Sequence, residues 1–344
     1  MATFSSKIVT IERHTLQQQQ FRPGATGALT QLLNDVAASA KIISREVRRA
    51  GLGDILGDDG SVNASGDDVK KLDVYADKAI YRMNDHTGRV CVMASEEQEE
   101  IIPIPDKFAS ESAKYVLMFD PLDGSSNIDC NASIGTIFSI HLRQSKGAHG
   151  TLEDCLQPGC KQVAAGYVIY GSSTVMVYTT GHGAHGFTLD STLGEFLLSH
   201  EDIKIPDAGK IYSINERDTH SWTPNLRRYV AWLKEEDAET RRPRTSRYIG
   251  SMISDVHRTL IKGGVFMYPG TVKRPDGKLR LQYEVNPLAF VVEQAGGCAI
   301  TEDGGRVLDL QPTELHQRTS VFMGSKNDVD ECAAFLDGSH PALA

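Results

Sequence analysis

Cysteine is scarce in this sequence and never forms a Cys-x-x-Cys pair, because its six cysteines are scattered over 344 residues. A dense disulfide framework is therefore not expected, and reduced, buried thiols in a cytosolic-type compartment are the better interpretation. Long apolar runs are also lacking: no stretch approaches 18 apolar residues, and residues 1–10 lack the apolar core of a secretory signal. We therefore expect neither a membrane-spanning nor an exported protein.

Basic residues are outnumbered by acidic ones, 36 Lys and Arg against 45 Asp and Glu, which gives a formal net charge of −9. This balance disfavours a general nucleic-acid binder, because neutralising a phosphate backbone needs a basic face. A small phosphorylated substrate is still compatible, because metal ions or a local Lys/Arg cluster reverse the field inside one cleft. Aromatic residues are few, at 7%, but 40% apolar and 24% charged residues are typical of a globular protein.

The order of periodic segments predicts an α/β protein with two lobes that divide near residue 200. Residues 1–25 contain the polar run Gln17–Gln20 and the breaker Pro23-Gly24, so we expect a mobile or regulatory lead-in. Helical spacing of apolar residues predicts helices over about 28–50 and 72–83, joined by a Gly-rich acidic loop over 51–68. Asp67 or Asp68 is placed to cap the second helix.

Short β-rich runs separated by turns follow in the first lobe, and the second lobe mixes both periods. The predicted strands are Val90–Ala94, Val116–Phe119, Thr136–Leu142, Val163–Tyr170, Thr174–Thr180, Gly194–Leu198, Lys210–Ile214 and Val265–Tyr268. The predicted helices of the second lobe are Leu226–Leu233, Met252–Leu260 and one through Leu281–Ala295, which starts or kinks at Pro287 and stops at Gly296-Gly297.

The densest chemical signal is the segment 119–127, Phe-Asp-Pro-Leu-Asp-Gly-Ser-Ser-Asn, directly after a predicted buried strand. Asp120 and Asp123 can both point into the crevice at the carboxyl end of that strand, where α/β proteins usually place their sites. Gly124 permits close backbone approach, and the N–H groups of Ser125 and Ser126 would then face an anion. The pattern indicates a metal and a phosphate, although Asp123-Gly124 alone is also an ordinary turn.

Other segments supply further carboxylates. Glu96 and Glu97 follow a predicted strand, Asp67 and Asp73 bracket a helix start, and Glu284 lies on a late helix. Taken singly, they are explained as surface acids, helix caps or ion-pair partners. If they converge, their mutual repulsion requires divalent cations, and hard oxygen ligands select Mg²⁺ or Mn²⁺.

Basic residues cluster late in the chain, at Arg241, Arg242, Arg244 and Arg247 and again at Lys273, Arg274, Lys278 and Arg280. A solvated charged face is the default explanation, and a second phosphate held away from the metals is the alternative. His182-x-x-His185 lies in a Gly-rich stretch with no third ligand at zinc spacing, so a hairpin loop is favoured over a zinc site.

Several motifs in a fixed order carry a resemblance to a known family. They are residues 66–73 (GDDVKKLD), 95–97 (SEE), 119–130 (FDPLDGSSNIDC), 211–216 (IYSINE), 247–252 (RYIGSM), 255–259 (DVHRT) and 277–284 (GKLRLQYE). From about Arg22 to the C-terminus the chain closely resembles the class of fructose-1,6-bisphosphatase found in eukaryotes and many bacteria. The Asp-Pro-Leu-Asp-Gly core is shared with the wider lithium-sensitive sugar and inositol phosphatase superfamily, whereas the late motifs are typical of sugar bisphosphatases.

The resemblance implies a layered αβαβα sandwich, a homotetramer, and hydrolysis of the 1-phosphate of fructose 1,6-bisphosphate in gluconeogenesis, with Mg²⁺ as cofactor and Mn²⁺ or Zn²⁺ as substitutes. By the same resemblance the metals are held by Asp67, Glu96, Asp120, Leu122 through its carbonyl, Asp123 and Glu284. Asp73 and Glu97 correspond to the pair that positions and deprotonates the attacking water. The reaction is an in-line displacement at phosphorus.

The resemblance also assigns ligand-binding residues. The substrate residues are Gly124, Ser125, Ser126, Asn215, Arg247, Tyr248, Tyr268, Lys278 and Arg280, with Arg247 reaching in from a neighbouring subunit. The residues of an inhibitory AMP site are Thr26, Gly27, Leu29, Thr30, Lys114 and Tyr115. Residues 26–200 are thus expected to form an AMP-type regulatory lobe that carries most metal-ligand carboxylates, and residues 201–344 a sugar bisphosphate-binding lobe.

The sequence departs from the family pattern at two sites. Arg217-Asp218 stands where the family usually has Gly-Tyr, so one phosphate contact is lost or is replaced by Arg217. In the AMP site Ala28 stands where a glutamate is usual, and Leu142 stands in place of an arginine, which is displaced by one position to Arg143. These changes predict weaker nucleotide inhibition.

Two alternative functions stay open. A sedoheptulose-1,7-bisphosphatase shares the metal centre and differs in the sugar pocket, whereas a catalytically inactive nucleotide sensor uses the same fold without turnover. We expect a cytoplasmic location, or a peroxisome-like organelle if a C-terminal address beyond Pro341–Ala344 has been trimmed.

Overall fold

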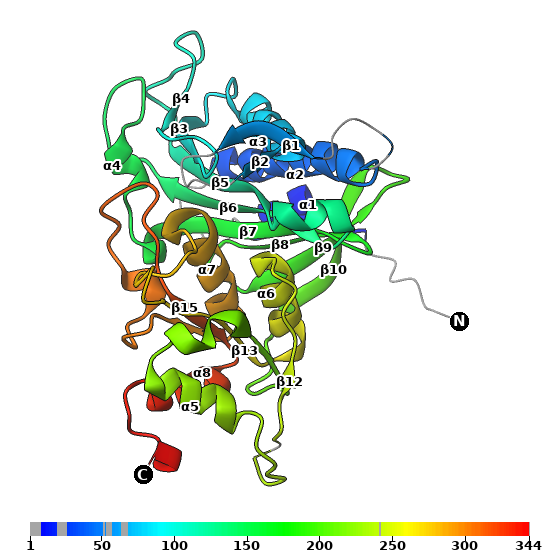
Figure 1. The fold of residues 1–344 in the computed structure, drawn as a ribbon. Coiled ribbons are helices and arrows are strands. Elements are labelled where there is room, and N and C mark those ends of the chain that lie inside the picture. Colours follow the sequence, from blue (N-terminus) through cyan, green and yellow to red (C-terminus); the bar gives the residue numbers. More distant parts are fainter. Residues whose placement is uncertain are drawn as a thin grey trace.

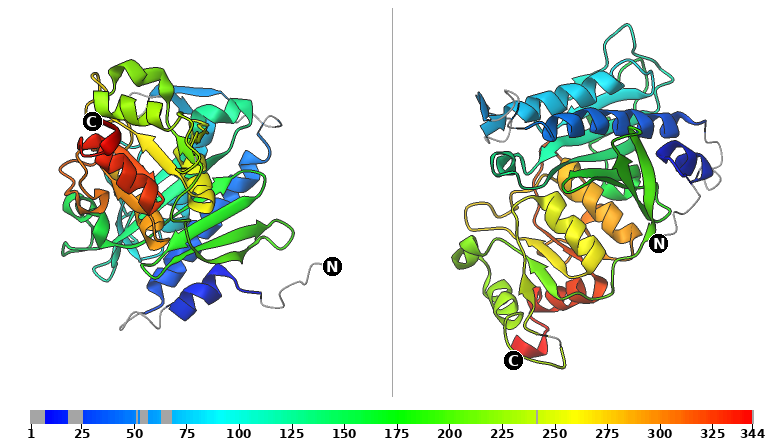
Figure 2. Two further views of the ribbon diagram at one scale, coloured as in Figure 1. Left: turned by 90° about the horizontal axis from the view of Figure 1, so that it is seen from below. Right: turned by 90° about the vertical axis from the view of Figure 1, so that its right-hand side faces the viewer.

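The computed structural model describes residues 8–18, 26–50, 52, 57–62, 68–240 and 242–343. Apart from a two-stranded sheet of β1 (Asp58–Val62) and β2 (Asp68–Lys70), these residues form two larger β-sheets that alternate with pairs of helices, a layering seen from the side in the right-hand view of Figure 2. The layered αβαβα sandwich expected from the sequence is confirmed.

Two helices cover the outer face of the larger sheet, α2 (Ala28–Val47) and α3 (Lys71–Asn84) (Figure 1). The eight-stranded sheet has the order β10-β9-β8-β7-β6-β5-β3-β4 and is antiparallel except between β3 and β5. Its strands are β3 (Val90–Ser95), β4 (Ile102–Pro103), β5 (Tyr115–Asp123), β6 (Ile134–Leu142), β7 (Gln162–Tyr170), β8 (Thr174–Thr179), β9 (Ala184–Asp190) and β10 (Glu195–Ile203).

Helices α6 (Met252–Lys262) and α7 (Asn286–Gln294) form the middle layer, followed by a five-stranded sheet of order β12-β11-β13-β15-β14 (Figure 1). Its strands are β11 (Ile211–Ser213), β12 (Thr245–Ser246), β13 (Val265–Tyr268), β14 (Cys298–Ile300) and β15 (Val321–Gly324). Helices α5 (Pro224–Trp232) and α8 (Lys326–Leu336) form the last layer.

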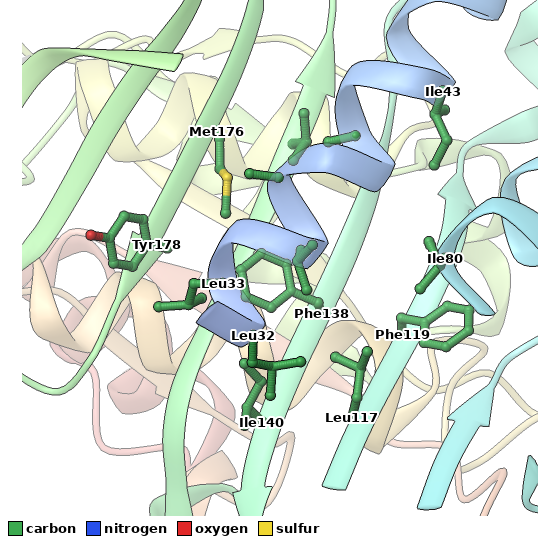
Figure 3. Packing of buried hydrophobic residues seen from close by; sticks show 14 of the residues in the cluster. Leu32, Leu33, Ile43, Ile80, Leu117, Phe119, Phe138, Ile140, Met176 and Tyr178 are labelled. Carbon is green, nitrogen blue, oxygen red and sulfur yellow. The ribbon is translucent and has the colours of Figure 1, made fainter. Parts of the chain in front are cut away.

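Alternation along the central strands explains why both faces of the larger sheet are buried. In β7, Ala164 and Val168 pack toward α2, whereas Ala165 and Tyr167 pack toward α6 and α7. Figure 3 shows the first of these cores, with the apolar stripe of α2 packed on strand side chains such as Phe138. The apolar residues spaced along α2 and α3 are those that predicted these helices from the sequence.

The structure differs from the sequence-based expectation mainly in short elements. Residues 11–18 of the expected mobile lead-in form helix α1 (Ile11–Gln18), in which His14 is buried and hydrogen bonds to Tyr178 of β8 at 2.6 Å. The expected loop over 51–68 contributes β1 (Asp58–Val62), which pairs with β2 (Asp68–Lys70). Strand β9 begins in the predicted hairpin loop, and β4, β14, β15, α4 (Leu152–Cys155) and α8 were not predicted.

The expected cap of α3 is also corrected. Lys70 is the N-cap residue, and the side chain of Asp73 accepts its backbone N–H at 2.8 Å. Asp68 lies in β2 instead, and Asp67 lies outside the described residues.

All six cysteines are free, as expected, but the expectation of burial holds only for Cys91, Cys155 and Cys332. Cys130 and Cys160 are exposed, and Cys298 is half-buried. Within the described ranges, no helix is both long enough and apolar enough to span a lipid bilayer.

Candidate active site

A cavity of about 530 Å³ gathers most of the predicted site residues from both halves of the chain. Its acidic side chains are Asp73, Glu96, Glu97, Asp120, Asp123 and Glu284, and its polar and basic ones are Lys70, Ser125, Ser126, Asn215, Tyr248, Tyr268, Lys278 and Arg280. Leu122 and Gly124 also line it. The cavity has the size of an ordinary small-molecule site but is far more charged than most.

An irregularity in β5 brings two of the aspartates to the same side. The strand continues through Asp123, so the expectation that it ends at Phe119 is wrong. Residues i and i+3 of a regular strand point to opposite faces. Here the pairing with β6 shifts between Asp120, opposite Ile137, and Asp123, opposite Gly135, and the extra residue lets both aspartates line the cavity.

Glu96 and Glu284 complete a buried acidic cluster with Asp120. One carboxylate oxygen from each of the three lies within 4.8 Å of the others. Glu96 directly follows β3, and Glu284 lies in a π-turn (Leu281–Val285) just before α7, where it is only 4% exposed. The interpretation of Glu284 as an ordinary surface acid is therefore excluded.

Burial and mutual repulsion raise the pKa values of these carboxyls. Burial, with the neighbouring carboxylates, raises the pKa of Asp120 well above its usual value and the pKa of Asp123 and of Glu284 to about 7. The pKa of Glu96 is also raised, although its ion pair with Arg280 at 2.8 Å opposes the effect of burial. A bound divalent cation relieves the same repulsion as a proton does, so the donor set fits hard cations such as Mg²⁺ or Mn²⁺.

Asp73 has one carboxylate oxygen that is hydrogen bonded and one that, within the described part of the chain, is not. Its Oδ2 accepts the N–H of Lys70 at 2.8 Å, whereas its buried Oδ1 has no hydrogen-bond partner among the described residues. Burial raises its pKa to about 7, although the bond from Lys70 opposes this. Such a carboxylate can take a proton near neutral pH. Glu97, half-buried, lines the same cavity.

The turn after β5 approaches helix α6 so closely that only glycine fits. Gly124 has φ +75°, and a Cβ there would lie 2.6 Å from Cβ of Ser251. A 3₁₀ helix (Ser125–Cys130) starts at this point and sets Ser125 and Ser126 on the cavity wall. Lys70, which was not among the predicted site residues, also lines the cavity and pairs with Asp129 at 3.0 Å.

Four predicted sugar-phosphate residues, Asn215, Tyr248, Tyr268 and Lys278, line the cavity together. Burial and the neighbouring Tyr268 raise the pKa of Tyr248, so its hydroxyl stays a neutral donor. Arg247 is exposed, donates to the carbonyl of Ser246 at 3.0 Å, and does not line the cavity of its own chain.

Comparison with known proteins follows the same two halves. A family model described as fructose-1-6-bisphosphatase, N-terminal domain, matches residues 9–201, and one described as the C-terminal domain matches residues 205–337. The chain belongs to the fructose-1,6-bisphosphatase family. A class 1 fructose-1,6-bisphosphatase of Chloroherpeton thalassium is 57% identical over 333 residues, 96% of this chain and 94% of that protein. One of Chlorobium luteolum is 58% identical, over 97% of this chain and 99% of its own length.

Solved structures agree with the sequence relatives. The holo form of Leishmania major fructose-1,6-bisphosphatase superposes with a TM-score of 0.89 at 40% identity, covering 96% of this chain and 99% of that one. The T-state form of the same protein gives a TM-score of 0.85. The chain is therefore an enzyme of carbohydrate metabolism, a phosphatase of the fructose-1,6-bisphosphatase type.

The tyrosine that the family pattern has after Asn215-Glu216 is not replaced by Arg217 in the cavity. Arg217, the expected replacement for the missing tyrosine, is exposed and does not line the cavity. Its backbone N–H instead donates to Oδ1 of Asn215 at 3.2 Å.

Arg89 connects the two segments that are expected to bind AMP, the start of α2 and residues 114–115. The N–H groups of Lys114 and Tyr115 both donate to the carbonyl of Arg89, at 3.0 and 3.1 Å, and its guanidinium contacts Gln31 and Asp35 of α2. Gly27 takes φ +80° before α2. Thr26 is exposed, Thr30 and Tyr115 are buried, and Leu29 packs on the core beside them.

The arginine displaced to position 143 is already engaged elsewhere. Its guanidinium donates to the carbonyls of Gly147 and His149, each at 2.6 Å, and of Ser110 at 3.3 Å. Leu142 is 49% exposed and has no group that can bind a phosphate.

Proposed function

We propose that this chain hydrolyses the 1-phosphate of fructose 1,6-bisphosphate to fructose 6-phosphate and phosphate, with Mg²⁺ as cofactor and Mn²⁺ or Zn²⁺ as substitutes. The observation that carries the proposal is one cavity in which a buried acidic cluster faces Lys278, Tyr248 and Asn215. The acidic cluster suits a metal-dependent reaction at one phosphate of the substrate, and the neutral and cationic side chains suit binding of its second phosphate.

The metal ligands in this proposal are Glu96, Asp120, Asp123, Glu284 and the carbonyl of Leu122. Asp67 is a further ligand in the proposal, although it lies outside the described residues. When bound, the cations neutralise the phosphoryl oxygens, activate water and stabilise the leaving alkoxide. The protein contributes a fixed, buried set of oxygen ligands whose repulsion drives cation uptake.

Asp73 and Glu97 act on the attacking water. The orphaned Oδ1 of Asp73 accepts a proton from water as its oxygen attacks phosphorus, and the ester oxygen of the sugar leaves from the opposite side. Gly124, Ser125 and Ser126 bind the phosphate that departs, through backbone and hydroxyl donors.

At the other end, Asn215, Tyr248, Tyr268 and Lys278 bind the 6-phosphate half of the sugar. Arg280 lines the same cavity, and its ion pair with Glu96 links the two ends. Arg247 reaches the site of a neighbouring subunit, which fits its exposed position outside the cavity of its own chain. This role presupposes the homotetramer.

We further propose a cytoplasmic, gluconeogenic enzyme inhibited by AMP, and membership in the lithium-sensitive phosphatase superfamily. Residues 26–200 serve as the regulatory lobe and residues 201–344 as the sugar-binding lobe. The existence of a T-state form of the Leishmania major enzyme supports allosteric regulation in the family. With Leu142 unable to bind phosphate and Arg143 engaged, we expect AMP to bind more weakly than in a site with an arginine at 142.

The proposed substrate, metal dependence and inhibition are tested by assaying phosphate release from a panel of sugar bisphosphates. The assay is run with Mg²⁺ and with chelator, and AMP and Li⁺ are titrated. Preferred turnover of sedoheptulose 1,7-bisphosphate would replace the substrate assignment. Absence of turnover with retained AMP binding would favour the nucleotide-sensor alternative.

A further inference from the structure

The segment 247–250 places Tyr248 and Gly250 on the cavity wall although it has no regular structure of its own. It connects the short strand β12 to the start of α6. The motif at residues 255–259 (DVHRT), to which no function has yet been assigned, lies on α6. Two charged residues of that motif, Asp255 and Arg258, hold the backbone of this segment.

Their contacts with this segment are hydrogen bonds to its backbone, most of them partly buried. Asp255 is fully buried, and its two carboxylate oxygens accept the N–H of Ile249 at 3.3 and 3.1 Å. Nη2 of Arg258 donates to Asp255 Oδ1 at 2.5 Å and to the carbonyl of Arg247 at 2.9 Å. Ser213 of β11 donates to the same carbonyl at 2.5 Å. The backbone on both sides of Tyr248 is therefore fixed to α6.

The first turn of the same helix holds a candidate metal ligand. Oδ2 of Asp123 accepts the hydroxyl of Ser251 at 2.9 Å and the N–H of Ile253 at 2.8 Å. Residues 253 and 255 both lie near the start of this helix, two positions apart. Helix α6 thus links the acidic cluster directly to the segment that carries Tyr248.

We propose that Asp255 and Arg258 are positioning residues, which set Tyr248 at a fixed place relative to Asp123 and so match the pocket to the spacing between the two substrate phosphates. Neither residue lines the cavity, so both act through the segment 247–250. The inference rests on the proposed function. A buried ion pair is weak evidence of a stabilising role, because its desolvation offsets much of the attraction.

The test compares Arg258→Met and Arg258→Lys with the wild type. Arg306→Met is the matched control, because Arg306 also pairs with an aspartate three residues away, Asp309 at 2.8 Å. The other partner of its side chain is Glu293 rather than the segment 247–250. Steady-state kinetics with fructose 1,6-bisphosphate is combined with inhibition by fructose 6-phosphate and, separately, by inorganic phosphate.

We expect Arg258→Met to raise KM and the inhibition constant of fructose 6-phosphate about tenfold, equivalent to ~1.4 kcal/mol. The kcat, the Mg²⁺ requirement and inhibition by inorganic phosphate should change by less than about twofold, because Asp123 keeps its bonds from residues 251 and 253. Arg258→Lys should return KM most of the way to the wild-type value, since one nitrogen of Arg258, Nη2, makes the bonds to Asp255 and to the carbonyl of Arg247 and a third to Oγ of Ser213 at 3.1 Å.

The positioning role would be overturned if Arg258→Met weakened the binding of fructose 6-phosphate and of inorganic phosphate equally, or if it left KM unchanged. An identical kinetic change in Arg306→Met would also overturn it. If Arg258→Met does not fold, Asp255→Asn provides the second variant, because it keeps an oxygen acceptor for Ile249 while removing the charge that orients Arg258. A wild-type enzyme that fails to release phosphate with Mg²⁺ contradicts the proposed function itself, whereas wild-type activity with unaltered KM in these variants contradicts only the inference.

Discussion

Stabilisation of the protein by Mg²⁺ should depend steeply on pH, because protons and cations compete for the same buried carboxylates. The pKa of Asp123 and that of Glu284 are both raised to about 7, chiefly by burial. At pH 8 most of these groups are ionised and ready for a cation, whereas at pH 6 most carry a proton that the cation must displace. Mg²⁺ affinity should therefore fall as pH falls through 7.

The size of the effect follows from these two pKa values. A group of pKa about 7 weakens apparent cation affinity about tenfold between pH 8 and pH 6, so two such groups weaken it roughly a hundredfold. At saturating Mg²⁺ this corresponds to about 3 kcal/mol of free energy of unfolding. With an unfolding entropy of about 2.1 cal/mol/K per residue over 344 residues, the difference in Tm is roughly 4 °C.

The assay is thermal unfolding with and without Mg²⁺ at each pH. Burial lowers the pKa of His14, His141 and His257 to about 4, which changes stability with pH by itself. Taking the difference between the Mg²⁺ and chelator scans removes this contribution, because these histidines lie outside the cavity.

Two variants sharpen the measurement. Asp123→Asn should reduce both the Mg²⁺ shift in Tm and its dependence on pH. Glu331→Gln is the matched control, because burial also raises the pKa of Glu331 to about 7. It should change neither quantity, because Glu331 lies outside the cavity. A Mg²⁺ shift equal at pH 6 and pH 8, or one altered as strongly by Glu331→Gln as by Asp123→Asn, would refute the reasoning.

Three further predictions concern single residues. Asp120→Ala and Glu96→Gln each remove a proposed metal ligand, so kcat should fall by several factors of ten, at ~1.4 kcal/mol for each; near-wild-type turnover at saturating Mg²⁺ would contradict the assignment. Arg247→Ala should raise KM more than it lowers kcat, and a dilution series that yields active monomers with unchanged KM would show that this arginine does not act between subunits. Leu142→Arg should tighten AMP binding about tenfold or more, because it adds a charge-assisted bond of ~1.5–3 kcal/mol. If calorimetry finds the same AMP affinity in Leu142→Arg, in Lys114→Ala and in the wild type, AMP binds elsewhere.

The long elements were predictable because their periodicity is strong and reflects burial. Helix α2 shows its apolar stripe at every turn, and β13 was predicted with the bounds that it has. Helix α1 was missed because most of its side chains are polar. It is held by the bond between His14 and Tyr178 and, just before the helix, by the bridge between Thr10 and Leu197 of β10, contacts that no local pattern reveals.

The chemistry was easier to predict than the geometry. Sequence motifs named the acidic residues, but not that Glu284 would be buried or that Arg280 would pair with Glu96. Ser251 belonged to a quoted motif without a role, and its bond to Asp123 became evident only when α6 was placed beside the turn at Gly124. Contacts between residues more than a hundred positions apart leave no signal in one sequence.

The acidic cluster depends on two departures from regular secondary structure. A regular β5 would point Asp120 and Asp123 to opposite faces, and the shift of register between them is what brings both to the cavity. The π-turn before α7 similarly sets Glu284 beside the same carboxylates. Both irregularities bring carboxylates together in a buried place, where the carboxylates repel one another and raise one another's pKa. A fold stabilised only by its own contacts gains nothing from this arrangement, so the cluster is best explained by a cation that compensates it and by the reaction which that cation serves.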